Sequence, residues 1–131
     1  MGIDDKTLKL LIDAAVKAKE NSYSPYSKYR VGAALLTADG KIYTGANVEN
    51  ASFGATICGE RAAFVSAISD GARDFVAIAI AGDKEYCYPC GICRQFMSEF
   101  NKNLEVISVN GNGEYVRDRL PDLLAHMFTE F

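Results

Sequence analysis

The sequence of 131 residues has no surplus of basic residues, which argues against a nucleic-acid partner. It holds 14 Lys and Arg residues against 17 Asp and Glu residues, so its formal net charge is −3 at pH 7. A surface that binds a duplex usually carries a basic surplus and often runs of Lys or Arg, and no such run occurs here. We therefore expect a small neutral ligand rather than a nucleic acid.

Long apolar runs are also lacking. No stretch reaches the ~20 apolar residues that a membrane-spanning helix needs. The N-terminal residues include Asp4 and Asp5 and are too acidic for a secretory signal peptide, and Lys6 stands where a myristoylation motif needs Ser or Thr. These features predict a cytoplasmic protein without membrane contacts.

The sequence shows no internal repeat, low-complexity tract or linker. Its hydrophobic fraction is 49% and its charged fraction is 24%, which are ordinary values for a folded globular chain. This length suits one domain and leaves little room for two. We expect a single domain over residues 1–131.

Histidine is nearly absent, so any metal site must depend on other side chains. The single histidine, His126, has no second histidine near it in the sequence and is interpreted as structural or solvent-facing. The sequence has four cysteines, Cys58, Cys87, Cys90 and Cys93. Without a secretory signal, such closely spaced cysteines favour metal or redox chemistry over disulfides.

Hydrophobic spacing predicts alternating helices and strands. The predicted helices cover residues 4–20, 57–68, 91–100 and 120–126. The predicted strands cover residues 31–37, 42–48, 75–81 and 104–109. The chain ends with that last helix or with a short strand. This order predicts an α/β fold in which helices cover both faces of a sheet.

Two segments carry the most specific chemical signal, residues 56–61 and 88–95. Each places cysteine at the predicted start of a helix, where unpaired N–H groups and the helix dipole favour the thiolate that binds metals. Cys90 and Cys93 are three residues apart and share one face of a helical turn. Cys58 can complete the site from the other helix.

Three thiolates leave one tetrahedral position of a zinc ion free for water, which is the arrangement of a catalytic site. Glu60 can face that position and move protons between the water and a substrate. Arg61 and Arg94 can donate hydrogen bonds to the thiolates and so preserve the electrophilicity of the metal.

Taken as bare cysteines, the pattern leaves other interpretations open. C-x-x-C also occurs in structural zinc half-sites and redox pairs, and an iron–sulfur site would need a further cysteine at its usual spacing. Cys87 could bind metal in place of Cys90, although it is interpreted as a bystander thiol. Glu60 could instead stabilise a helix dipole, and Arg61 could form a surface ion pair.

The combined motifs resemble the zinc deaminases. Residues 58–60 (Cys-Gly-Glu) and 89–93 (Pro-Cys-Gly-Ile-Cys) match the three-cysteine variant of that signature. Residues 25–35 and 47–52 extend the resemblance to the homotetrameric zinc-dependent cytidine deaminases along nearly the whole chain. The resemblance implies a three-layer α/β/α domain with a mixed, roughly five-stranded sheet.

The resemblance also implies the chemistry. Cys58, Cys90 and Cys93 would bind one Zn²⁺ per chain, and Glu60 would be the proton shuttle. Zinc-bound hydroxide would attack C4 of cytidine or deoxycytidine, which gives uridine or deoxyuridine and ammonia in pyrimidine salvage.

Further roles in substrate binding follow from the same resemblance. Asn47 and Glu49 would hold the ribose hydroxyls, the N–H of Gly59 would meet the pyrimidine O2, and Tyr29 would lie beside the base. Ala51, Phe53 and Phe128 would reach a neighbouring subunit's site in a homotetramer. Four positions depart from the family's usual residues, which are Phe at Tyr29, Tyr at Phe53, Ala at Gly59 and Pro at Ala125.

Three other functions compete with this hypothesis. A blasticidin-type deaminase would share the chemistry, but Asn47 and Glu49 favour a ribose. A polynucleotide deaminase would need a basic or aromatic-rich strip, which the acidic sequence lacks. A non-catalytic zinc module would explain the cysteines without giving Glu60, Asn47 or Glu49 a purpose.

Overall fold

The computed structural model describes residues 2–129. The α-helices are α1 (Asp5–Ala18), α2 (Gly59–Ser69), α3 (Gly91–Phe100) and α4 (Leu120–Leu123). The strands are β1 (Gly32–Thr37), β2 (Ile42–Ala46), β3 (Phe75–Ala81), β4 (Glu105–Val109) and β5 (Tyr115–Arg119). Two short 3₁₀ helices are η1 (Lys19–Asn21) and η2 (Phe53–Ala55). Within residues 2–129, no helix combines the length and the apolar character needed to cross a bilayer.

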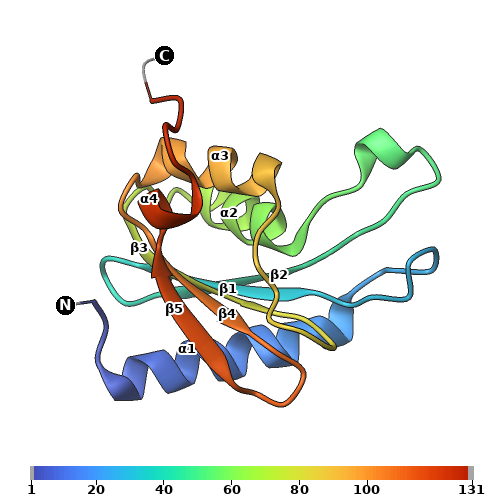
Figure 1. Cartoon of the computed structure of the whole chain (residues 1–131), viewed down its shortest axis with the longest axis horizontal. Coiled ribbons are helices and arrows are strands. Elements are labelled where there is room, and N and C mark those ends of the chain that lie inside the picture. The colour runs from blue at the N-terminus through green and yellow to red at the C-terminus, as the bar shows by residue number, and fades with distance from the viewer. Residues whose placement is uncertain (1, 130–131) are drawn as a thin grey trace.

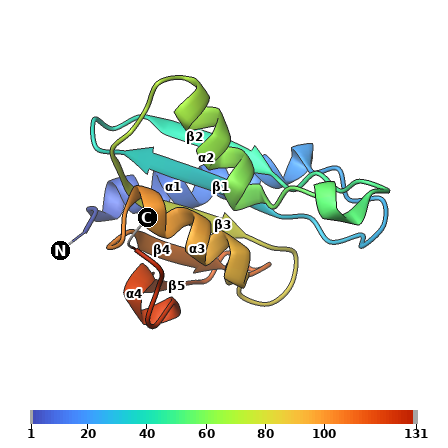
Figure 2. The same ribbon diagram turned by 90° about the horizontal axis from the view of Figure 1, so that it is seen from above.

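The strands form one mixed sheet in the order β2-β1-β3-β4-β5. Only β3 and β4 pair in parallel, because the chain crosses over through α3 between them, and the other neighbours are antiparallel. Helix α1 covers one face of the sheet and α2 and α3 cover the other (Figures 1 and 2). The predicted three-layer α/β/α fold with a mixed five-stranded sheet is confirmed.

Each face of the sheet has its own hydrophobic core, because successive strand residues point to opposite faces. In β3, Ile78 and Ile80 pack toward α2 and α3, whereas Ala77 and Ala79 pack toward α1. The central strand β1 is buried along its whole length. The sheet and both helix layers therefore fix the start of α2, where the chemical motif begins.

The ends of three predicted elements were wrong by a few residues. The helix predicted over 57–68 begins at Gly59, and the strand predicted over 42–48 ends at Ala46. At the C-terminal end, both β5 and α4 occur, and α4 is shorter than predicted. It ends at Leu123, because Leu124 has φ −142° and His126 has a left-handed φ of 55°, neither of which continues a helix.

Candidate metal centre and substrate pocket

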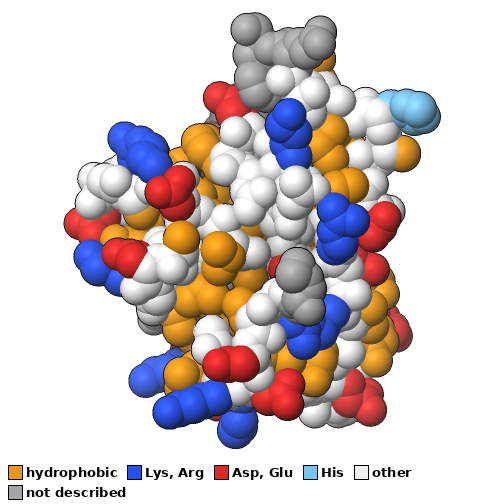
Figure 3. Space-filling view, turned by 90° about the vertical axis from the view of Figure 1, so that its left-hand side faces the viewer, with side chains coloured by type: hydrophobic (Ala, Val, Ile, Leu, Met, Phe, Trp, Pro, Cys, Tyr) orange, Lys and Arg blue, Asp and Glu red, His pale blue; other side chains and the backbone are white. Residues whose placement is uncertain are grey.

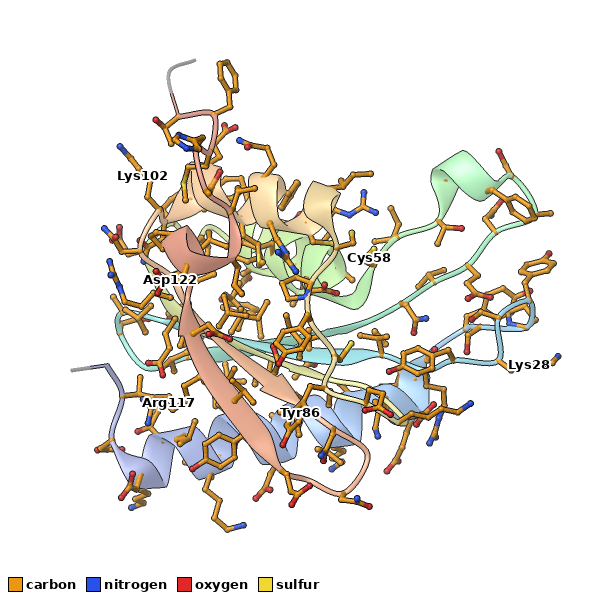
Figure 4. All side chains as sticks on the ribbon, viewed as in Figure 1. Lys28, Cys58, Tyr86, Lys102, Arg117 and Asp122 are labelled. Atoms are coloured by element: carbon orange, nitrogen blue, oxygen red, sulfur yellow. The ribbon has the colours of Figure 1, made fainter. Side chains whose placement is uncertain are left out.

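The two adjacent helices α2 and α3 bring three cysteines together. Cys58 is the N-cap residue of α2, Cys90 is the N-cap residue of α3, and Cys93 lies in the first turn of α3. Their sulfur atoms all lie within 4.8 Å of one another. Tetrahedral zinc with Zn–S bonds of about 2.3 Å places its sulfurs ~3.8 Å apart, so these three side chains fit a zinc ion. Figure 4 shows Cys58 where α2 begins.

The surroundings of Cys58 favour its thiolate form. The pKa of Cys58 is lowered to about 5, chiefly by a hydrogen bond from the Cys93 thiol and also by Arg61. The same hydrogen bond and burial raise the pKa of Cys93, because one proton is shared between the two sulfurs. The guanidinium of Arg61 donates to Cys58 Sγ over 3.4 Å. Cys93 is fully buried, which shields the site from one side.

Glu60 lies in the first turn of α2, next to the cysteines, and only 4% of its surface is exposed. Burial raises the pKa of Glu60 to about 7, and the nearby Cys58 thiolate adds to that increase. A carboxyl group with a pKa near neutrality can both accept and release protons under physiological conditions. A carboxylate that only stabilised a helix dipole would have no need of such burial.

A pocket of about 200 Å³ opens beside Glu60 and two of the cysteines. Its walls come from the end of the loop before β1, from the segment after β2, from the start of α2 and from the loop before α3. The lining residues are Val31, Asn47, Thr56, Ile57, Cys58, Gly59, Glu60, Cys87, Tyr88 and Cys90. The structure thus brings Asn47 and Gly59 into the same pocket as Cys58, Cys90 and Glu60.

Asn47 is held in place by its own hydrogen bonds. Its side-chain oxygen accepts from the backbone N–H of Val31 and from the hydroxyl of Ser22, and its Nδ2 donates to the carbonyl of Tyr29 over 2.9 Å. One amide hydrogen remains outside these bonds. The side chain is therefore oriented firmly while it still offers one donor.

Glu49 accepts hydrogen bonds from the backbone N–H groups of Tyr26 and Ser27 and from the Ser27 hydroxyl. The bond from the Ser27 side chain is the main reason why the pKa of Glu49 is lowered. Glu49 is thus an ionised acceptor at neutral pH, and it is not among the residues that line the pocket.

Tyr29, like Glu49, is not among the lining residues, and three further predicted contacts also lie outside the lining. Ala51 and Phe53 lie on an exposed arm, which we define as residues 22–28 together with residues 48–57, and Phe53 is 78% exposed. Both parts of the arm project beyond the same end of the sheet (Figures 1 and 2). Phe128 is also exposed, and its backbone exchanges hydrogen bonds with the Gln95 side chain.

The two arginines differ in what they contact. Arg61 donates to a sulfur, whereas Arg94 donates to the carbonyls of Pro89 and Leu123. The Arg94 side chain therefore acts on the cysteine cluster indirectly, by holding the backbone that precedes Cys90. It also connects that backbone to the C-terminal segment.

Several lining residues were not among the predicted contacts. The additional lining residues are Val31, Thr56, Ile57 and Tyr88. Cys87 also lines the pocket, although it was interpreted from the sequence as a bystander thiol. The only feature of the sequence that could have identified these lining residues is their position next to a motif. Tyr88 adjoins Pro89, and Thr56 precedes Cys58 by two residues.

A larger cavity of about 600 Å³ lies near the N-terminal end, by Arg117 and Asp122. Figure 3 shows that side of the molecule, with hydrophobic side chains at its centre and acidic and basic side chains around them. Arg117 is already paired with Glu105 there. Among the described residues, the lining of this cavity includes no cysteine, serine or histidine and no candidate metal cluster, so the smaller pocket is the better candidate for chemistry.

Comparison with known proteins agrees with the geometry. Residues 5–109 match the family model described as the cytidine and deoxycytidylate deaminase zinc-binding region. A probable cytidine deaminase of Dictyostelium discoideum is 42% identical over 130 residues, which span 98% of this chain and 88% of that protein. A cytidine deaminase of Halalkalibacterium halodurans is 46% identical over 123 residues, covering 92% and 93% of the two chains.

Among solved structures, the chain resembles a crystal structure of cytidine deaminase from Burkholderia pseudomallei. The TM-score is 0.88 at 47% identity, and the match covers 92% of this chain and 98% of that one. The similarity therefore extends over the whole fold and includes the cysteine segments.

Proposed function

The chain belongs to the cytidine and deoxycytidylate deaminase family, and we propose that it hydrolyses cytidine and deoxycytidine to uridine and deoxyuridine plus ammonia. One observation carries this proposal, namely the placement of the buried Glu60 carboxyl beside the cluster of Cys58, Cys90 and Cys93. A reaction of this kind serves pyrimidine salvage.

The three cysteines would hold one Zn²⁺ per chain, and the bound ion would supply Lewis-acid activation of a water molecule. Glu60 would take a proton from that water and deliver it to N3 of the pyrimidine. It would later pass the second proton of the former water, then on the C4 hydroxyl, to the departing amino group. The raised pKa of Glu60 suits this exchange, because both its protonated and its ionised forms are populated near pH 7.

The surrounding residues would bind and orient the nucleoside. The N–H of Gly59 would meet the pyrimidine O2, and Tyr29 would lie on the side of the base. The free amide hydrogen of Asn47 and the ionised Glu49 would hold the ribose hydroxyls, one as donor and one as acceptor. These two pre-oriented groups support a nucleoside rather than a free base as substrate.

The active form would be a homotetramer in the cytoplasm. Phe53 on the arm and Phe128 near the C-terminal end are exposed, and their burial against neighbouring chains would complete each substrate site. The four cysteines are unpaired thiols in the structure, which suits a reducing compartment.

The test is the loss of cytidine absorbance in the ultraviolet with the wild type and with Glu60→Ala. We expect one zinc per chain in both proteins and a loss of about a hundredfold or more in kcat for Glu60→Ala. The exposed Glu20→Gln is the matched control and should keep wild-type activity. Activity of Glu60→Ala within a few-fold of the wild type would contradict the role of Glu60. A zinc-loaded wild type that leaves cytidine unchanged would contradict the proposed reaction.

A further inference from the structure

The loop over residues 82–89 forms one wall of the pocket and has no regular secondary structure. Cys87 and Tyr88 line the pocket, and the loop leads directly into Cys90. Its backbone contacts the sheet at few points, since the N–H groups of Gly82 and Cys87 both donate to the carbonyl of Val109. The N–H of Gly111 also donates to the carbonyl of Lys84 over 2.8 Å, and side chains from elsewhere add further contacts to this wall.

The hydroxyl of Tyr29 is one of these holding groups. Burial raises the pKa of this hydroxyl, the nearby backbone N–H groups of Lys84 and Asp83 partly offset that increase, and the Cys87 thiol lies beside it. Tyr29 thus contacts both the beginning of the loop and the cysteine that faces the pocket. The groups around the hydroxyl therefore all belong to the 82–89 loop.

Gly82 lies directly against this hydroxyl. A Cβ atom added at residue 82 would lie 2.2 Å from Tyr29 Oη, 3.1 Å from Tyr29 Cζ and 3.1 Å from Cys87 Cβ. The first distance is impossible for non-bonded atoms, whereas the other two require shifts of only a few tenths of an ångström. Residue 82 can therefore be nothing larger than glycine while the hydroxyl keeps its place.

Two charged side chains hold the same loop from outside. Arg30 forms a paired contact with the Asp83 carboxylate, with Nη2 at 2.9 Å from Oδ1 and Nε at 3.2 Å from Oδ2. Lys19, which is 9% exposed, donates to the carbonyl of Gly82 over 3.0 Å and lies 3.4 Å from Asp83 Oδ1. The start of the loop is thus fixed between η1 and the segment before β1.

From these contacts we propose that Tyr29 is a positioning residue, whose hydroxyl fixes the 82–89 wall of the pocket and thereby dictates glycine at residue 82. The use of this wall in deamination rests on the proposed function. The packing of the hydroxyl against Gly82 does not, so the two can be tested separately.

The experiment is a double-mutant cycle with Gly82→Ala, Tyr29→Phe and the combined variant. Three quantities are measured: the midpoint of thermal unfolding, the rate of zinc release to a chelator, and kcat and KM for cytidine. We expect Gly82→Ala to speed zinc release and lower kcat/KM by about tenfold or more, because the added methyl displaces the loop. Tyr29→Phe alone should lower kcat/KM by about two- to tenfold, since the loop loses the hydroxyl that packs against Gly82.

The decisive result is the combined variant. Without the hydroxyl, the closest contacts of the new methyl group are those at 3.1 Å. Adding Tyr29→Phe should therefore restore most of the kcat/KM and the slow zinc release that Gly82→Ala loses. Tyr43→Phe is the matched control, because the Tyr43 hydroxyl bonds to Asp70 on another part of the surface. Tyr43→Phe alone should leave the unfolding midpoint, zinc release and kcat/KM almost unchanged. It should not restore these quantities in Gly82→Ala.

A combined variant as impaired as Gly82→Ala, or a Gly82→Ala protein equal to the wild type, would overturn the proposal. Should Gly82→Ala fail to fold, recovery of a folded protein in the combined variant would still support it. Thermal unfolding and zinc release need no cytidine, so rescue in those measurements supports the positioning role even if the wild type fails to deaminate cytidine.

Discussion

At the scale of single residues, Arg61 joins the cysteine cluster to the pocket wall. Its Nη2 lies 3.4 Å from both Cys58 Sγ and the carbonyl of Thr56. A donor on a metal-binding thiolate reduces the charge that the sulfur gives to the metal. We expect Arg61→Gln to lower zinc affinity or kcat by about 10- to 100-fold, measured by competition with a chelator and by cytidine turnover.

The control for that substitution is Arg73→Gln, because the Arg73 guanidinium bonds to the carbonyls of Ile68 and Ala72 at the far end of α2. Arg73→Gln should keep both zinc affinity and turnover. Equal behaviour of the two variants would mean that Arg61 has no special relation to the site.

The motif residues and the lining residues differ in how far sequence could identify them. Cys58 and Glu60 follow from spacing, because two positions at a helix start are close in any fold. The contact between Cys87 and Tyr29 could not be predicted from the sequence. The two residues meet only because the fold brings the loop after β3 next to the segment before β1. Contacts of that kind depend on tertiary packing, which local patterns do not encode.

At the scale of elements, the close approach of β2 to α2 positions the start of α2. A Cβ at Gly45 would lie 2.4 Å from the backbone nitrogen of Ala63 and 2.8 Å from the carbonyl oxygen of Gly59. Both contacts are with the backbone of α2, which cannot rotate away. We expect Gly45→Ala to lower the free energy of unfolding by about 1–3 kcal/mol and to reduce cytidine turnover, because α2 must move with Cys58 and Glu60.

Chemical denaturation and zinc content measure this effect. Thr44→Ala is the control, because Thr44 lies on the same strand and its side chain is exposed. It should lower the free energy of unfolding much less than Gly45→Ala. Unchanged stability of Gly45→Ala would show that α2 can shift without loss.

The elements themselves were predictable where periodicity was strong, as in α1 and β3. Their ends were harder to predict. β2 was predicted to continue through residues 47 and 48, but the N–H of Val31 bonds to the Asn47 side chain instead of its backbone, and Val48 pairs with Ile57. The chain thus leaves the sheet to form the arm, and the cause is a set of distant hydrogen bonds rather than a local breaker residue.

At the scale of the whole molecule, the proposed homotetramer predicts that two chains cooperate at each site. If Phe53 completes a neighbour's pocket, Phe53→Ser should lower cytidine turnover while one zinc per chain remains bound. Glu60→Ala should be inactive for a different reason, because its own pocket lacks the proton carrier. The Phe53→Ser variant therefore keeps Glu60, and the Glu60→Ala variant keeps Phe53.

Mixing the two inactive proteins under conditions that exchange subunits should restore activity. In a mixed oligomer, an intact Phe53 from a Glu60→Ala chain can enter the pocket of a Phe53→Ser chain, which still has its Glu60. Turnover of cytidine before and after mixing, with oligomer size measured by analytical ultracentrifugation, tests this expectation. Recovery would place Phe53 and Glu60 of different chains in one site. No recovery, despite mixed oligomers of full size, would mean that each chain forms its pocket alone.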